Sequence, residues 1–147
     1  MIQYLNLPPI PTRLLDEFEE RSGLCPNMED NFVKTSEHCQ GITDWCRENV
    51  CPDLFYGVQI MQGMVPKHTD RSHSNLVPEC KLVYLVDPGG ANVKTRFWDG
   101  DMPLREFIIE PLRWHLIQVN VVHSVEGIEN NRKRWGVTTQ MLHKELI

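Results

Sequence analysis

The sequence predicts a mainly β fold of the α+β class, in which two short helices precede a sheet-rich region. Short runs of β-branched and aromatic residues recur from residue 54 onward, turn signals with Gly or Pro separate them, and two amphipathic segments come before them. Several strands behind helices are typical of a sandwich or a jelly roll with helical buttressing. We therefore expect a helical part at about residues 1–53 and a jelly-roll core at about residues 54–142.

The two helices are predicted over Thr12–Glu20 and Thr43–Asn49. The first has its apolar residues on one stripe and is expected to end at Gly23, because glycine readily adopts the left-handed conformation that closes a helix. The second is expected to begin with Thr43 as its N-cap. The predicted strands are Leu54–Gln62, Lys81–Val86, Val93–Trp98, Glu106–Ile109, Trp114–Val122 and Trp135–Leu142.

Length and composition predict a single soluble domain over residues 1–147. The chain is 41% hydrophobic and 24% charged, which is ordinary for a globular protein. Its net charge is -5, and its one run of basic residues is Arg132–Arg134. Because nucleic-acid binding rests largely on neutralising phosphates, nucleic acid is disfavoured as a partner, and a small molecule or a peptide is expected instead.

The cysteines and the chain start indicate a reducing compartment. The five cysteines are an odd number, and no signal peptide opens the chain. No apolar run approaches the ~20 residues that would cross a bilayer. We therefore expect reduced thiols, a cytoplasmic location and no membrane insertion.

Candidate metal ligands lie in the strand-rich half. His68 and Asp70 are two residues apart, so on an extended strand both side chains point to the same face. His123 follows at the end of a predicted strand, and Arg134 begins the next one. Two histidines and one carboxylate on one face of an octahedral ion leave three positions open, as non-haem Fe(II) oxygenases require. Arg134 could then pair with a carboxylate of a bidentate co-substrate.

The segments His68–Asp70, His123–Val125 and Arg134–Thr138 resemble the pattern of the 2-oxoglutarate and Fe(II)-dependent oxygenases, most closely the prolyl-hydroxylase-like branch. The likeness covers roughly residues 56–142. It implies a double-stranded β-helix of jelly-roll type, Fe(II) as the metal and 2-oxoglutarate as co-substrate, and it leaves a need for ascorbate open. The implied reaction releases succinate and CO2. Asp70 argues for hydroxylation, because halogenating members have a small residue there.

The resemblance also implies two further residues around 2-oxoglutarate. Tyr84 matches a tyrosine that helps to hold the co-substrate in related enzymes, and Thr138, four residues after Arg134, would face the same pocket. The branch that demethylates nucleic acids has another Arg six residues after the co-substrate Arg, where this chain has Gln140. This departure disfavours demethylation of bases, in agreement with the acidic charge.

Several alternatives stay open at this point. His73 could replace a ligand, although it lies in a polar stretch typical of a loop, and Arg132 competes with Arg134 for the co-substrate. His115 fits a packed or partly exposed histidine. The competing function is a cupin-like metal-binding or non-catalytic β-domain, which would have no use for Arg134. The substrate would be set by loops, including Arg71–Pro78, that match no specific pattern.

Overall fold

The computed structural model describes residues 1–70, 79–140 and 142–143, which form two helices and eleven strands. The helices are α1 (Thr12–Ser22) and α2 (Gln40–Asn49). The strands are β1 (Ile2–Tyr4), β2 (Phe32–Thr35), β3 (Tyr56–Met61), β4 (Val65–His68), β5 (Glu79–Asp87), β6 (Lys94–Asp99), β7 (Met102–Phe107), β8 (Trp114–Gln118), β9 (His123–Glu126), β10 (Arg134–Thr139) and β11 (Leu142–His143).

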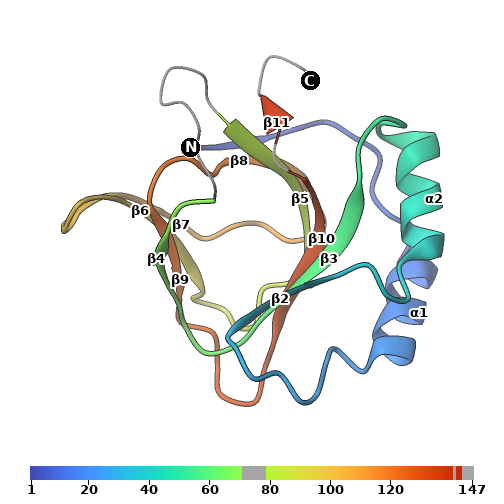
Figure 1. The fold of residues 1–147 in the computed structure, drawn as a ribbon, viewed down its shortest axis with the longest axis horizontal. Helices are drawn as coiled ribbons and strands as arrows, with labels where there is room; N and C mark the ends of the chain where they lie inside the picture. The colour runs from blue at the N-terminus through green and yellow to red at the C-terminus, as the bar shows by residue number, and fades with distance from the viewer. Residues whose placement is uncertain (71–78, 141, 144–147) are drawn as a thin grey trace.

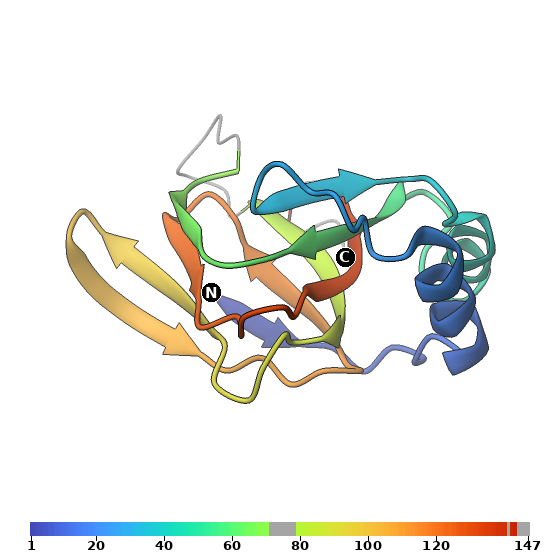
Figure 2. The ribbon, with the colours of Figure 1, turned by 90° about the horizontal axis from the view of Figure 1, so that it is seen from below.

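The strands form two antiparallel sheets, which confirms a mainly β fold with two helices. The larger sheet has the order β1-β8-β5-β10-β3-β2, with β11 paired to β5, and the smaller has the order β4-β9-β6-β7. In Figure 1 the strands surround a central space, and both helices lie on one side, against the larger sheet. Figure 2 shows the β6–β7 hairpin extending away from the body at the end opposite the helices.

Successive side chains of each strand in the larger sheet point to opposite faces, and both faces are buried. The side chains that point toward the helices are mainly apolar and pack on α1 and α2. This set comprises Tyr56, Val58, Ile60, Cys80, Leu82, Tyr84, Trp114, Leu116, Trp135 and Val137. The intervening residues face the smaller sheet, where a second core cluster includes Met61, Val65 and Val125. The space between the sheets is therefore built from residues one position out of phase with the helix-facing core.

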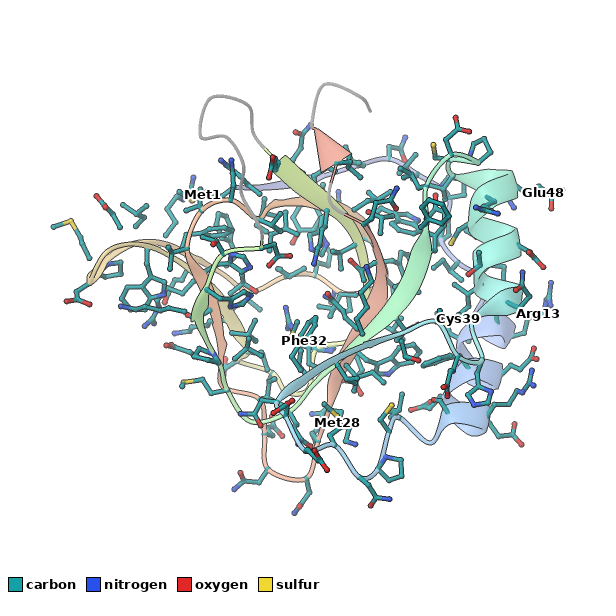
Figure 3. The ribbon with its side chains drawn as sticks, in the orientation of Figure 1. Met1, Arg13, Met28, Phe32, Cys39 and Glu48 are labelled. Atoms are coloured by element: carbon teal, nitrogen blue, oxygen red, sulfur yellow. The ribbon has the colours of Figure 1, made fainter. Side chains whose placement is uncertain are left out.

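The helices form where amphipathic spacing predicts them, with one difference at α2. The helix α1 ends at Gly23, whose φ of 60° is left-handed and whose N–H donates to the carbonyl of Glu19. The helix α2 begins at Gln40, before the predicted Thr43, and no side chain caps its first turn. Figure 3 shows Arg13 and Glu48 pointing outward from the two helices. None of the helices in the described ranges is long and apolar enough to cross a bilayer.

The strand boundaries correct the predicted division of the chain. The first 53 residues are not only helical, because β1 and β2 extend the larger sheet at its two edges. The predicted strand Trp114–Val122 ends at Gln118, and His123 begins a separate strand in the smaller sheet. The chain changes sheets between them, where Val119 and Val122 accept hydrogen bonds from Asp70 and Trp98. Strand β7 also begins earlier than predicted, at Met102.

Candidate metal centre

Two histidines face each other across neighbouring strands of the smaller sheet. His68 is the last residue of β4 and pairs in register with His123, the first residue of β9. Directly opposed residues of an antiparallel pair project from the same face. Their ring centroids are consequently 4.3 Å apart.

Asp70 completes the group from just beyond the end of β4. Its backbone N–H donates to the carbonyl of Val119, with a separation of 2.9 Å. Its Oδ1 lies 3.6 Å from Nε2 of His68 and 3.7 Å from Nε2 of His123. One ligand atom from each of the three residues lies within 4.8 Å of the others, so a single ion could bind all three.

The backbone fixes which ring nitrogens face the carboxylate. Nδ1 of His68 lies 2.7 Å from the carbonyl oxygen of Pro66, and Nδ1 of His123 lies 2.7 Å from that of Val121. A ring N–H that donates to a carbonyl leaves the lone pair on Nε2, where a metal binds. Burial lowers the pKa of His123, which favours the neutral imidazole that metal ligation requires.

Lys81 is a charged neighbour of this group that the sequence interpretation missed. It lies on β5 of the larger sheet, and its Nζ contacts Oδ2 of Asp70. The two side chains are 17% and 18% exposed, so this ion pair is largely shielded from solvent. Lys81 shares a strand face with Val83 and Leu85, but the sequence alone does not show that this face meets Asp70.

The metal-ligand group opens into a cavity of about 540 Å³ between the sheets. Both sheets contribute its walls, which are mainly apolar, with Met61 and Leu85 from one sheet and Val65 and Val125 from the other. Phe32 from β2 also lines it, and Figure 3 shows this side chain within the ring of strands. A small organic molecule could therefore lie beside the three ligands and be enclosed by apolar side chains.

Arg134 lies in the wall of the same cavity, at the start of β10. It is only 4% exposed, and its guanidinium donates to the carbonyl of Pro88 at 3.3 Å and to Oγ1 of Thr95 at 3.4 Å. Burial lowers the pKa of Arg134 to about 10, and the negative charge of Asp87 offsets part of this decrease. Within the described part of the chain, no carboxylate forms an ion pair with this guanidinium. A buried cation without an anionic partner is costly, so the site favours an anionic ligand.

The geometry separates Arg134 from its competitor. Arg132 is partly exposed, bonds Oδ1 of Asp87 at 3.0 Å and pairs with Glu129. It does not line the cavity, whereas Arg134 does. Asp87 is thereby bound by Arg132, and of the two arginines only Arg134 lines the cavity.

The cavity lining does not include Tyr84 or Thr138, the two further residues that the resemblance implied. The side chain of Tyr84 is buried in the helix-facing core, 5.1 Å from the ring of Trp114, because it is out of phase with Lys81 and Val83 on β5. Thr138 has the parity of Arg134 but does not line the cavity, and its hydroxyl donates to the carbonyl of Thr139.

His115 is a packed histidine, one of the two alternatives that the sequence left open, and it lines the cavity. It is 2% exposed and lines the cavity from β8, directly opposite Val83 of β5. Burial and the charge of Arg134 lower its pKa to about 3, so its imidazole is neutral at physiological pH. The alternative ligand His73 and the segment 71–78 lie outside the described residues.

Comparisons with known proteins reveal a shared fold. No protein-family model matches the chain, and no curated protein matches it. The non-heme monooxygenase ThoJ, solved as a nickel complex, has 10% identity and a TM-score of 0.51 over 97% of this chain and 75% of its own. AviO1 from Streptomyces viridochromogenes Tue57 has 12% identity and a TM-score of 0.51 over 94% of this chain and 87% of its own.

A third structure, EvdMO1, has 12% identity and a TM-score of 0.54 over 94% of this chain. This chain spans 46% of EvdMO1, about half of that protein. At such low identities the likeness shows the fold alone. The chain thus shares the fold of these three proteins, and its own residues must indicate the reaction.

Proposed function

We propose that this protein is a non-haem Fe(II) and 2-oxoglutarate-dependent dioxygenase. It hydroxylates a small molecule or a protein side chain and releases succinate and CO2. In this proposal the two sheets form a double-stranded β-helix of jelly-roll type. His68, Asp70 and His123 bind the iron, and Arg134 binds the co-substrate.

One observation carries the proposal: the three ligand residues and a buried arginine, which forms no ion pair within the described residues, line a single cavity. A metal site alone explains the histidines and Asp70 but gives no reason for a cation 4% exposed in the cavity wall. A co-substrate that chelates the metal at one end and carries a carboxylate at the other explains both. 2-Oxoglutarate has this chemistry.

The donor set fits iron. Two imidazole nitrogens and one carboxylate oxygen suit a first-row divalent metal, and three protein ligands leave coordination positions for co-substrate and dioxygen. Bound Fe(II) supplies the oxidative chemistry that the protein's own side chains cannot perform. The backbone contacts of His68 and His123 hold both Nε2 atoms toward Asp70 before any metal binds.

The remaining cavity residues orient the co-substrate and exclude water. Arg134 offers a planar fork for the far carboxylate, and Thr95 and Pro88 hold that fork in place. Apolar side chains around it lower the local dielectric, which strengthens the pairing of a carboxylate with Arg134. The substrate would enter beside Phe32, where the cavity wall is partly exposed.

The fold of ThoJ, a non-heme monooxygenase solved with nickel, is consistent with this proposal. The competing function, a cupin-like metal-binding or non-catalytic β-domain, leaves the buried charge of Arg134 without a role. We therefore favour the enzyme.

An anaerobic titration tests the proposal. Fe(II) together with 2-oxoglutarate should give a visible charge-transfer band, which reports the chelate of the 2-oxo acid on iron. The band should be absent in His68→Ala and in Asp70→Ala. A protein that binds Fe(II) at these residues but develops no band with 2-oxoglutarate would support the metal-binding alternative.

A further inference from the structure

The two carboxylate oxygens of Asp70 have different neighbours. Oδ1 faces Nε2 of both His68 and His123, at 3.6 and 3.7 Å. Oδ2 contacts the ammonium group of Lys81 instead. One oxygen therefore belongs to the ligand group, and the other is already bound by a cation.

Asp70 is held by two contacts, one of its backbone and one of its carboxylate. The backbone N–H of Asp70 donates to Val119, which follows β8, and its Oδ2 contacts Lys81 on β5. Rotation of the carboxylate would break the second of these contacts. The ion pair is largely shielded from solvent, so it is stronger than a fully exposed pair.

We infer that Lys81 is a positioning residue that holds Asp70 to one metal bond. A carboxylate can bind a metal through one oxygen or through both, and the second mode would occupy a coordination position that the co-substrate or dioxygen needs. With Oδ2 bound to the ammonium group, only Oδ1 is free for the metal. This inference rests on the proposed function, because it requires the metal to bind at His68, Asp70 and His123.

The test compares Lys81→Met, Lys81→Gln and Lys81→Arg in the full chain. Met removes the charge with little change in side-chain length, Gln provides a second neutral variant in case Met prevents folding, and Arg preserves the cation. Lys94→Met is the matched control, because Lys94 also pairs with a carboxylate, that of Glu106, but lies outside the cavity lining. Melting curves establish that each variant is folded.

Two anaerobic measurements are made with Co(II) as the probe metal. Infrared difference spectra, metal-loaded minus metal-free, of protein labelled with ¹³C-carboxylate aspartate report the binding mode through the splitting of the two carboxylate stretches. Calorimetry measures the affinity of the Co(II)-loaded protein for 2-oxoglutarate. Neither measurement depends on turnover.

We expect wild type, Lys81→Arg and Lys94→Met to show the wide splitting of a one-oxygen carboxylate. Lys81→Met and Lys81→Gln should show the narrower splitting of two-oxygen binding and bind 2-oxoglutarate about 10–100-fold more weakly, the usual effect of losing a partner of a metal ligand. Unchanged splitting and affinity in both neutral variants would overturn the inference.

Weaker 2-oxoglutarate binding with unchanged splitting would also overturn it, and would place Lys81 in contact with the co-substrate itself. Failure of the wild-type protein to bind Co(II) through an aspartate is a distinct result. It would overturn the proposed function, and the role of Lys81 with it.

Discussion

His68 and His123 are direct partners across the β4–β9 pair, with ring centroids 4.3 Å apart, although 54 residues separate them along the chain. The strand pairing alone brings them together, and Asp70 joins them from the residues that follow β4. The site therefore depends on the register of the smaller sheet.

Metal binding should stabilise the fold. At about 100 times its dissociation constant, a ligand specific for the native state adds about 2.7 kcal/mol to the free energy of unfolding. We expect this increase with Co(II) in urea unfolding of the wild-type protein and its loss in His123→Ala. An equal increase in both proteins would locate the metal elsewhere.

Replacement of Arg134 should weaken co-substrate binding and leave metal binding intact. In Arg134→Ala the affinity for 2-oxoglutarate should fall by about 2–4 kcal/mol, because a shielded charge pair loses one partner. Arg132→Ala is the control, since Arg132 pairs outside the cavity with Asp87 and Glu129. Calorimetry on Co(II)-loaded protein distinguishes them, and equal losses in the two variants would argue against Arg134 as the co-substrate ligand.

Replacement of the Tyr84 hydroxyl should not affect the co-substrate. The side chain of Tyr84 is in the helix-facing core, where burial raises the pKa of its phenol. We expect Tyr84→Phe to bind 2-oxoglutarate as the wild type does and to lose about 1 kcal/mol of stability, because its hydroxyl no longer forms a hydrogen bond with the backbone of Ile10. A substantial loss of affinity in calorimetry would instead restore the role that the family resemblance implied.

His115 should make the metal-free protein less stable in acid. Its folded-state pKa is lowered to about 3, so the unfolded chain takes up its proton first as the pH falls below the ordinary value of about 6.5. Between these two pKa values, each unit by which the pH falls lowers the free energy of unfolding by about 1.4 kcal/mol. Above the higher pKa, His115 does not change the free energy of unfolding. Urea unfolding at several pH values should show a shallower dependence in His115→Phe, and identical slopes would contradict this account.

A methyl group at residue 136 should strain the centre of the larger sheet. A Cβ there would lie 2.5 Å from the carbonyl oxygen of Tyr84 and 3.0 Å from Cα of Leu85, next to an irregularity in the β10–β5 register. We expect Gly136→Ala to lose about 1–3 kcal/mol of unfolding free energy. Gly41→Ala, in α2, would place its Cβ 3.3 Å from Cδ2 of Leu14, the flexible end of a side chain, and should change stability by less than about 1 kcal/mol. Comparable losses in both would indicate that the contact at Gly136 is relieved.

The sequence predicted those features that depend on local spacing. The buried stripe of α1 and its end at Gly23 follow from helical periodicity and glycine conformation. The His68-x-Asp70 spacing and the start of β10 at Arg134 likewise lie within short segments. Strand β4 was missed because it is only four residues long and contains Pro66, which is unfavourable in most strands.

Features that depend on register or on sheet packing were not predictable from local patterns. Tyr84 was assigned to the pocket from the family resemblance, and local patterns could not test this, because a strand buried on both faces does not reveal which face meets the pocket. The approach of Lys81 to Asp70 requires the two sheets to be stacked. The burial of His115 beside the cavity likewise depends on the pairing of β8 with β5.

The most direct measurement is a crystal structure of the protein with Mn(II) and a non-reactive 2-oxoglutarate analogue. The account predicts one metal ion bound by Nε2 of His68, Oδ1 of Asp70 and Nε2 of His123, with the far carboxylate of the analogue on the guanidinium of Arg134. A metal ion bound elsewhere, or an analogue whose far carboxylate lies away from Arg134, would contradict it.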